Sequence, residues 1–454
     1  MENALLILIV LFICILFIFG IISNKRVKDD EDFIVAGRQF NTFLTTFSLF
    51  ATWFGAGTLI TATDNISQRG LRDIVLEPVG SGLCLVIAGI FMASKLWNLK
   101  LYTISDFFKL KYGRATELYS VLTTIPIFVG WIAVQFVALA NLLSAFFSVE
   151  PYILIWIIAL LSMLLTILGG LWSVTITDSI QMFMIIIGLV IIFWNVIATH
   201  SGFVQLYHTT PTGLKTWIPT DKFRDFVSWL TVLSIAALGN LSGQDLMQRV
   251  FSAKNAKVAQ YGCILSGVLY ILVGMMPAFL GIFSNVIFKN TNNQNIIAIY
   301  AKEYLPPELT ILFVLCIFSA VFSTITSAIL APSSVIANNF LKDKFTKISP
   351  IALCRISVVL ITALSLITSF LGDNFYTILE KSYAIGLVSF FAPLMVGLFS
   401  KKEQNNPIGG LLAMLVGLSV WLSGFVISYS YPVEIYAVLA NFGVLIVFGK
   451  RSTN

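Results

Sequence analysis

The middle of the second apolar segment reads Phe50-Ala51-Thr52-Trp53-Phe54-Gly55-Ala56-Gly57-Thr58. Two glycines at this point, Gly55 and Gly57, lower the cost of unwinding a helix. An unwound helix exposes main-chain carbonyl oxygens, and inside a membrane these can replace the hydration oxygens of a cation. The alternative is that both glycines allow close packing between neighbouring helices.

The composition of the chain excludes a soluble globular protein. Of the 454 residues, 58% are hydrophobic and only 11% are charged, whereas about a quarter of the residues of a soluble protein are charged. A membrane crossing takes about 20 residues, so the chain has material for about a dozen transmembrane helices. We therefore predict an all-α polytopic membrane protein. Residues 1–454 would form one transmembrane domain in the lipid bilayer, with no nucleic acid as a partner.

Hydropathy places about 13 transmembrane helices along the chain. They are predicted at residues 4–23, 40–63, 74–94, 116–147, 151–170, 176–198, 226–247, 259–288, 309–341, 351–371, 376–399, 407–429 and 432–449. With these spans, 20 of the 28 Lys and Arg residues fall in loops on one side, Arg249 among them, and 7 fall on the other side. The positive-inside rule then predicts an outside N-terminus and a cytoplasmic C-terminus. We expect a cell (plasma) membrane, specifically a bacterial inner membrane.

Charged residues within the spans are candidates for function, because each costs at least about 2.5 to 3.5 kcal/mol to insert. They are Glu77, Asp178, Asp245, Glu380 and Lys381. Glu380 and Lys381 lie near the outer end of their span, where they either reach the membrane interface or have a role. Asp245 lies at the inner end of the span 226–247, and we expect interfacial water to solvate it.

A second polar stretch lies in the span 309–341, where residues 319–327 include five hydroxyl side chains. Positions 320, 323 and 324 share one face of a helix. Two hydroxyls and a free carbonyl on that face, opposite the carbonyls of a broken span 40–63, would form an all-oxygen site. Without a carboxylate, such a site suits a monovalent cation better than Ca²⁺ or Mg²⁺. The alternative is that these hydroxyls bond to carbonyls of their own helix.

Four segments together resemble one protein family, the sodium:solute symporters. One of them is the hydroxyl-rich stretch 319–327. The other three read Thr103-Ile104-Ser105-Asp106-Phe107-Phe108-Lys109-Leu110-Lys111-Tyr112-Gly113, Gly169-Gly170-Leu171-Trp172-Ser173-Val174-Thr175-Ile176-Thr177-Asp178-Ser179-Ile180-Gln181 and Gln244-Asp245-Leu246-Met247-Gln248-Arg249-Val250-Phe251-Ser252-Ala253-Lys254. They occur in the order typical of the family, and the resemblance covers nearly the whole chain.

The resemblance implies the leucine-transporter (LeuT) fold, in which two five-helix repeats have inverted topologies. The first repeat would be residues 40–198 and the second 226–399, with two additional C-terminal spans in 407–449. The first helix of each repeat, 40–63 and 226–247, would be broken.

The resemblance also implies where ions bind. Sodium, the coupling ion (Na⁺), would be held by the carbonyls of Ala51, Phe54 and Ala320 and by the hydroxyls of Ser323 and Thr324. Asp178 matches an acidic residue that is associated with sodium coupling in the family. With Thr326 and Ser327, it would form a second ion site or an inward exit point.

The solute site would lie between the two broken helices and their neighbours. The candidate residues are Trp53, Thr58, Glu77, Gln135, Asn240 and Ser382. The segment around Trp53, Ala-Thr-Trp-Phe-Gly-Ala-Gly, resembles the choline branch of the family. In that branch, aromatic rings can hold a quaternary ammonium by cation–π attraction. The spacing of Glu77 resembles that of a sugar-binding Glu, but Ala236, Gly239 and Asn240 depart from the sugar carriers.

We therefore expect a sodium-coupled symporter, functional as a monomer, that imports a small organic solute by alternating access. More specific alternatives are a carrier of a choline-like quaternary amine, or of proline, pantothenate or a monocarboxylate. A sodium-gated sensor or channel would have the same ion site without stoichiometric solute flux. An enzyme is not expected, because the spans carry no intramembrane cluster of paired Asp residues and no H-E-x-x-H or G-x-S-x-G motif.

Overall fold

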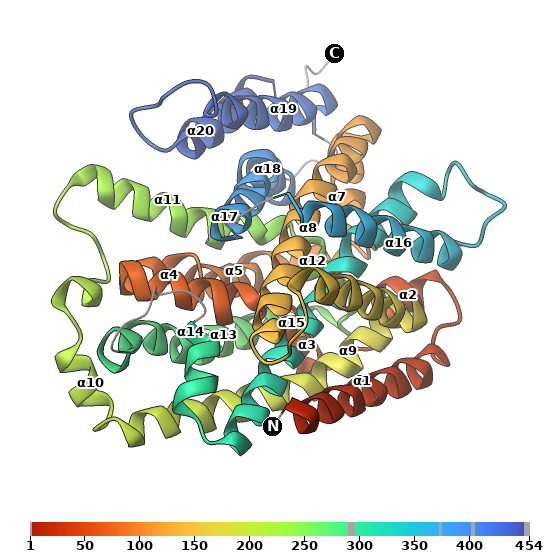
Figure 1. Ribbon diagram of the computed structural model, residues 1–454. Helices are drawn as coiled ribbons and strands as arrows, with labels where there is room; N and C mark the ends of the chain where they lie inside the picture. Colours follow the sequence, from red (N-terminus) through yellow and green to blue (C-terminus); the bar gives the residue numbers. More distant parts are fainter. Residues whose placement is uncertain (1, 289–295, 372–374, 401–404, 449–454) are drawn as a thin grey trace, which may run out of the picture.

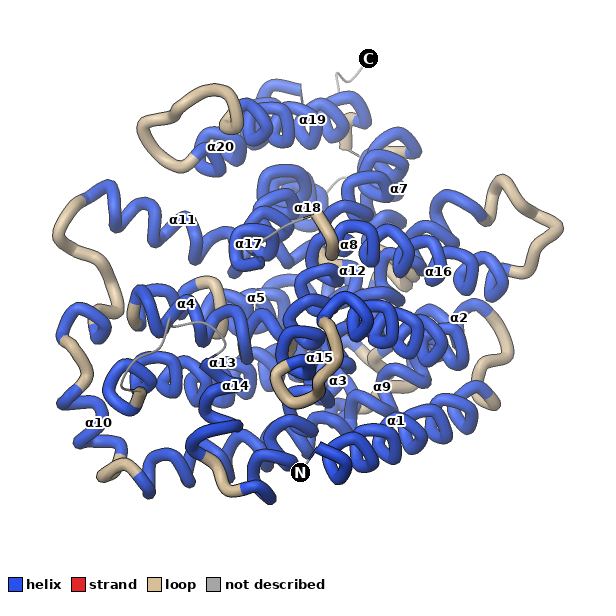
Figure 2. The backbone as a smooth tube through the Cα atoms, in the orientation of Figure 1, coloured by secondary structure: helices blue, strands red, loops and turns tan. Residues whose placement is uncertain are grey.

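The computed structural model describes residues 2–288, 296–371, 375–400 and 405–448, and these residues form a bundle of helices (Figures 1 and 2). No strand occurs in these ranges; a single isolated β-bridge joins Phe40 to Ala253. The all-α prediction is confirmed. Some positions used in the sequence analysis lie outside the described residues, namely Lys289, Lys401, Lys402, Gly449, Lys450 and Arg451.

The α-helices are α1 Glu2–Asn24, α2 Asp30–Val35, α3 Thr42–Trp53, α4 Ala62–Arg69, α5 Val79–Ile87, α6 Ser94–Asn98, α7 Ile104–Tyr112, α8 Arg114–Ser144, α9 Pro151–Thr199, α10 Phe203–Thr209, α11 Phe223–Gly239, α12 Gln244–Ser252, α13 Ala256–Ile287, α14 Ile296–Ile299, α15 Pro307–Ile336, α16 Pro350–Thr368, α17 Phe375–Gly386, α18 Ala392–Phe399, α19 Pro407–Ser423 and α20 Val433–Phe448. The 3-10 segments are η1 Ala36–Arg38, η3 Leu71–Val75, η5 Thr212–Lys215 and η6 Asn240–Ser242. The π segments are η2 Gly57–Thr61, η4 Ala88–Ala93, η7 Tyr300–Tyr304, η8 Ala337–Leu341 and η9 Leu387–Phe391.

Local sequence explains where two of these helices begin. The side chain of Asn41 accepts a hydrogen bond of 2.9 Å from the Leu44 amide, which caps α3. Thr103 and Asp106 form a reciprocal capping box at the start of α7. The family-like segment 103–113 is therefore a short helix with its own start signal.

The number of membrane-spanning helices by length and composition is lower than predicted. Within the described ranges, nine helices are long and apolar enough to cross a membrane, or ten if one bent pair forms a single span. Two predicted spans, 151–170 and 176–198, lie in the single 49-residue helix α9, where Gly170 has a positive φ of 52°. The last two predicted spans correspond to α19 and α20, which are shorter than 18 residues. These two causes account for the difference between thirteen and ten, and the count is nine when the bent pair is not taken as one span.

Both helices that the resemblance implied to be broken are broken. α3 ends at Trp53 and the chain resumes at Gly57, with a bend of 54° between the two parts. The other break separates α11 from α12, and it contains η6 and the extended residue Gly243. A helix end at each break leaves main-chain polar groups without their usual partners.

α3 and α12 lie in the middle of the bundle, whereas α11 extends from the second break to the edge (Figure 1). α3 packs against α9, α13 and α15, and α15 packs along α9 (Figure 1). α1 lies beside α9 at one edge, while α19 and α20 pack together at the opposite edge (Figure 1). The division into repeats 40–198 and 226–399, with 407–449 added, stays a prediction.

Candidate functional site

The break after α3 redirects two main-chain amides. In a continuous helix, the amide of Gly55 would donate to the carbonyl of Ala51. It donates instead to the carbonyl of Trp53 at 2.9 Å. The next amide, of Ala56, donates to the Oε1 atom of Gln135 at 2.7 Å. The carbonyl of Ala51 is thereby left free of its helical partner.

The freed carbonyl faces the hydroxyl-rich part of α15. Thr324 Oγ1 is 3.2 Å from the carbonyl oxygen of Ala51 and 3.1 Å from that of Ala320. Among the described residues, no donor is hydrogen-bonded to the carbonyl oxygen of Phe54. An unbonded main-chain oxygen at the negative end of a helix suits a cation. Of the predicted sodium site, the structure brings Ala51, Ala320 and Thr324 together, with Ser323 next to Thr324 on α15, and it places Phe54 at the break three residues after Ala51.

Gly55 leaves the space that this contact requires. A Cβ atom at residue 55 would lie 2.6 Å from both Thr324 Oγ1 and Gln135 Oε1. We expect Gly55→Ala to displace Thr324 and to raise the sodium concentration for half-maximal uptake about tenfold. Sodium titration of uptake in proteoliposomes measures this effect. Gly443→Ala in α20 is the matched control, because no atom lies within 4 Å of an added Cβ there. Equal sodium dependence in the two variants would contradict the assignment.

A fully buried carboxylate lies next to this contact. Asp178 Oδ1 accepts a hydrogen bond from Ser323, and Asp178 Oδ2 accepts one of 2.9 Å from Ser48. Ser327 donates to the same Oδ2 atom at 3.4 Å. The hydroxyl of Thr326 instead donates to the carbonyl of Ser323 at 2.9 Å. Of the three residues predicted to form a second ion site or an exit point, Asp178 and Ser327 are hydrogen-bonded to each other. The hydroxyl of Thr326 is hydrogen-bonded within its own helix.

The position of Arg249 differs from the prediction, which placed this residue in a loop outside the membrane. It is fully buried, and its Nη2 atom lies 3.6 Å from Asp178 Oδ2. The hydropathy of residues 244–252 is low, so the predicted span 226–247 ended before Arg249. Every residue of α12 is nevertheless buried, because the chain after the break stays inside the bundle.

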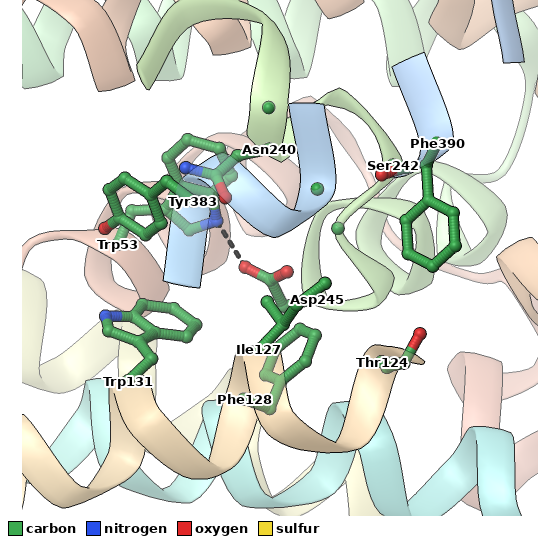
Figure 3. A pocket seen from close by; sticks show the side chains of 13 residues that line it. Trp53, Thr124, Ile127, Phe128, Trp131, Asn240, Ser242, Asp245, Tyr383 and Phe390 are labelled. Carbon is green, nitrogen blue, oxygen red and sulfur yellow. Dashed lines mark hydrogen bonds between the residues drawn. The ribbon is translucent and has the colours of Figure 1, made fainter. Parts of the chain in front are cut away.

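Aromatic side chains from several helices surround a small cavity between the two breaks (Figure 3). The cavity is lined by Trp53, Thr124, Ile127, Phe128, Trp131, Gly239, Asn240, Ser242, Gly243, Asp245, Tyr383, Gly386 and Phe390. Its volume of about 30 Å³ leaves room for one or two water molecules. Side chains must therefore move apart before an organic solute can enter.

Asp245 is the carboxylate of this cavity, and its position is also a correction. We expected interfacial solvation, but the residue is 4% exposed and accepts a 2.5 Å hydrogen bond from Trp53 Nε1 (Figure 3). The reason is the second break. α12 begins at Gln244, so Asp245 lies in a first helical turn beside the break and not at the far end of a continuous span.

The predicted solute residues divide into two groups. Trp53 and Asn240 line the cavity, whereas Thr58, Glu77, Gln135 and Ser382 do not. Ser382 donates to the carbonyl of Ile378 at 2.8 Å, within its own helix. Among the aromatic and acidic residues of the pocket, sequence reasoning missed Asp245, Phe128, Trp131, Tyr383 and Phe390. Their available signal was weak, since aromatic residues are common throughout the apolar segments.

Glu77 is surrounded by hydroxyl groups beside the cavity. Its Oε2 atom accepts from Tyr270 at 2.7 Å and from Thr58 at 3.0 Å. Its Oε1 atom accepts from Ser81 at 2.7 Å and from Tyr383 at 3.2 Å. Tyr383 also lines the cavity, so a single side chain links Glu77 to the cavity.

Two broken helices, with a cluster of oxygen atoms beside the first break and a pocket between the breaks, are typical of secondary active transporters of the LeuT-like class. The sequence model of the sodium:solute symporter family matches residues 33–417, and the chain belongs to that family. The protein is thus a sodium-coupled symporter and not an enzyme.

The comparisons include transporters of different solutes. The high affinity choline transporter 1 of Homo sapiens is 27% identical, with 92% of this chain and 76% of that protein covered. The sodium/proline symporter of Salmonella typhimurium is 22% identical, with 92% and 88% covered. The fold is similar to a solved Na⁺-coupled sialic acid symporter in a substrate-bound outward-open state. That match has a TM-score of 0.82 and 17% identity, and it covers 99% of this chain and 96% of that one.

Proposed function

We propose that the chain imports a small organic cation of the choline type together with sodium. The observation that carries this proposal is the buried carboxylate of Asp245 inside a pocket lined by five aromatic side chains. Aromatic faces attract a cation through their quadrupoles, most strongly where water is excluded. A carboxylate in the same pocket supplies the opposite charge. Similarity to choline transporters agrees with this solute class.

The charge of the pocket argues against the other solutes that we considered. None of the described residues that line it is Lys or Arg. A monocarboxylate or pantothenate would bring a second negative charge beside Asp245, and no Lys or Arg among the described residues lines the pocket to pair with it. Proline would bring both an ammonium and an unpaired carboxylate. A buried charge without a partner is costly, so a solute that carries only positive charge fits best.

The position of Trp53 supports a link between sodium binding and solute binding. Its indole ring lines the solute pocket, and it lies in the chain between the proposed sodium ligands Ala51 and Phe54. Sodium bound to those carbonyls and to Ala320, Ser323 and Thr324 would hold the break of α3 against α15. Holding the break also fixes Trp53 in the pocket, so that the bound ion favours solute binding.

The driving force is sufficient for concentrative uptake. A tenfold sodium gradient contributes about 1.4 kcal/mol, and each charge crossing 100 mV contributes about 2.3 kcal/mol. Because the solute is also a cation, two charges cross with one sodium ion, for a total of about 6 kcal/mol. This corresponds to solute accumulation on the order of 10⁴-fold.

The remaining details of the proposal concern the membrane context. We place the N-terminus outside and the C-terminus in the cytoplasm of a plasma membrane, such as a bacterial inner membrane. The support is the distribution of Lys and Arg along the sequence. We propose that one chain is the transporting unit, since the broken helices and the pocket are formed within a single chain.

Uptake of radiolabelled choline into proteoliposomes tests the proposal. We expect accumulation only with an inward sodium gradient, faster at an inside-negative potential, and inhibition by quaternary amines but not by pantothenate or lactate. Sodium-dependent uptake of proline or a monocarboxylate in place of choline would overturn the solute class. Sodium currents without solute accumulation would favour a sensor or channel.

A further inference from the structure

We infer that the guanidinium of Arg249 takes the place of a second coupling ion beside Asp178, so that the chain transports one sodium ion per solute. The inference rests on the proposed sodium coupling and adds the ion stoichiometry to it. It concerns the polar pocket formed by Asp178, Ser48 and Ser327, which lies next to the sodium site on the other side of Ser323.

The guanidinium uses the oxygens that an ion would need. Arg249 Nη2 donates to Ser327 Oγ at 2.7 Å and lies 3.6 Å from Asp178 Oδ2. Arg249 Nε donates to Ser48 Oγ at 3.2 Å. The charged carboxylate and both hydroxyls of the pocket therefore have a cationic partner within the protein.

Arg249 is held in this position by its own helix. Its Nη1 atom donates to the main-chain oxygen of Asp245 at 3.3 Å and to Gln248 Oε1 at 3.5 Å. Gln248 in turn donates to Ser334 Oγ on α15 at 3.1 Å. Both Arg249 and Asp178 are 0% exposed. Unlike a free ion, this cation is covalently attached and does not leave during transport.

The fixed charge also opposes an additional ion. A sodium ion bound to the same oxygens would lie within a few ångströms of the guanidinium, and like charges this close repel strongly in a buried site. At the first sodium site the arrangement differs: Arg249 makes no hydrogen bond to Ala51, Ala320 or Thr324 among the described residues. The negatively charged Asp178 links the guanidinium to Ser323, because Oδ2 lies 3.6 Å from Arg249 and Oδ1 accepts from Ser323.

Ser323 gives the pair a positioning role in the first site. Its hydroxyl proton is donated to Asp178, so its oxygen lone pairs remain available to an ion. Arg249 keeps the buried carboxylate charge-balanced while Asp178 orients Ser323. Arg249 and Asp178 together thus position Ser323 for the first ion site, and they leave no room for a second ion beside Asp178.

Equilibrium binding of ²²Na⁺ to the purified chain tests the inference without requiring the solute to be known. We expect one sodium ion per chain and a Hill coefficient of one. In proteoliposomes that take up choline, the ratio of ²²Na⁺ to choline should also be one. Two ions per chain would overturn the inference and leave the proposed function intact. No sodium binding would instead contradict the proposed sodium coupling.

Substitutions test whether the charge of the Arg249 guanidinium sets the number of bound sodium ions. Arg249→Gln removes the charge and leaves Asp178 free to bind an ion, so we expect two sodium ions per chain. Arg249→Gln with Asp178→Asn removes both charges and should restore one. Lys342→Gln, which breaks the exposed ion pair with Asp30, is the control and should keep one. One sodium ion per chain in Arg249→Gln would contradict the inference. If this variant does not fold, the sodium stoichiometry of the unmodified chain tests the inference by itself.

Discussion

Asp245→Asn is expected to lower kcat/KM for choline about 100-fold, which corresponds to about 2.7 kcal/mol. The substitution keeps the size of the side chain, and the Asn oxygen can still accept the hydrogen bond from Trp53 Nε1. The aromatic walls of the pocket therefore stay in place. What is lost is the negative charge that balances the cation in a site without bulk water. Uptake kinetics with radiolabelled choline measure the loss.

Glu434→Gln provides the matched control for this prediction. Glu434 also accepts a hydrogen bond from a tryptophan, Trp421 Nε1, at 3.0 Å, but it lies outside the aromatic pocket. We expect unchanged choline kinetics in this variant and unchanged sodium binding in both. An Asp245→Asn chain with the choline kinetics of the unmodified protein would remove the basis of the cation proposal.

Ser323→Ala combined with Thr324→Ala is expected to abolish the stimulation of uptake by sodium. The double substitution removes both hydroxyl ligands of the proposed ion site and leaves only the carbonyls of Ala51, Phe54 and Ala320. Asp178 also loses the donor Ser323. At sodium concentrations that saturate the unmodified chain, we expect uptake to stay at its level in sodium-free buffer, because the apparent sodium affinity falls by more than about tenfold. Sodium titration of initial uptake rates measures both effects.

The control for the double variant is a pair of buried hydroxyls with no role in ion binding. Ser357 and Thr362 on α16 donate to the carbonyls of Leu353 and Val358, each four residues earlier in the helix. Ser357→Ala with Thr362→Ala removes the same number of hydroxyls from the membrane. Equal sodium dependence in the two double variants would rule out the assigned ligands.

The fold could be predicted from the sequence because its determinants are local. Long apolar segments specify helices in a membrane, and Gly55 and Gly57 mark the point where α3 ends. The contact between this break and α15 could also be predicted, since Ala320, Ser323 and Thr324 share a helical face. That sodium binds there stays a prediction, and its full set of ligands came from the family resemblance.

The pocket could not be predicted, because it depends on packing between distant segments. Trp131 lines the cavity and is 7% exposed, whereas Trp194 is 72% exposed on the outside of the bundle. Both lie in apolar helices, and nothing in their local sequence distinguishes them. Asp245 and Arg249 were misplaced for a related reason. Hydropathy does not show that the chain after the second break stays inside the protein.

The proposed sodium ligands include three main-chain oxygens, those of Ala51, Phe54 and Ala320. Every amino acid carries a carbonyl group, so substitutions at these positions change the side chain without removing the ligand. The proposed solute pocket, in contrast, is lined mostly by side chains, with Gly239, Gly243 and Gly386 as the exceptions. Evolution can therefore exchange the pocket residues while the ion site persists. Such independence offers a physical reason why chains similar to this one are named for solutes as different as choline, proline and sialic acid.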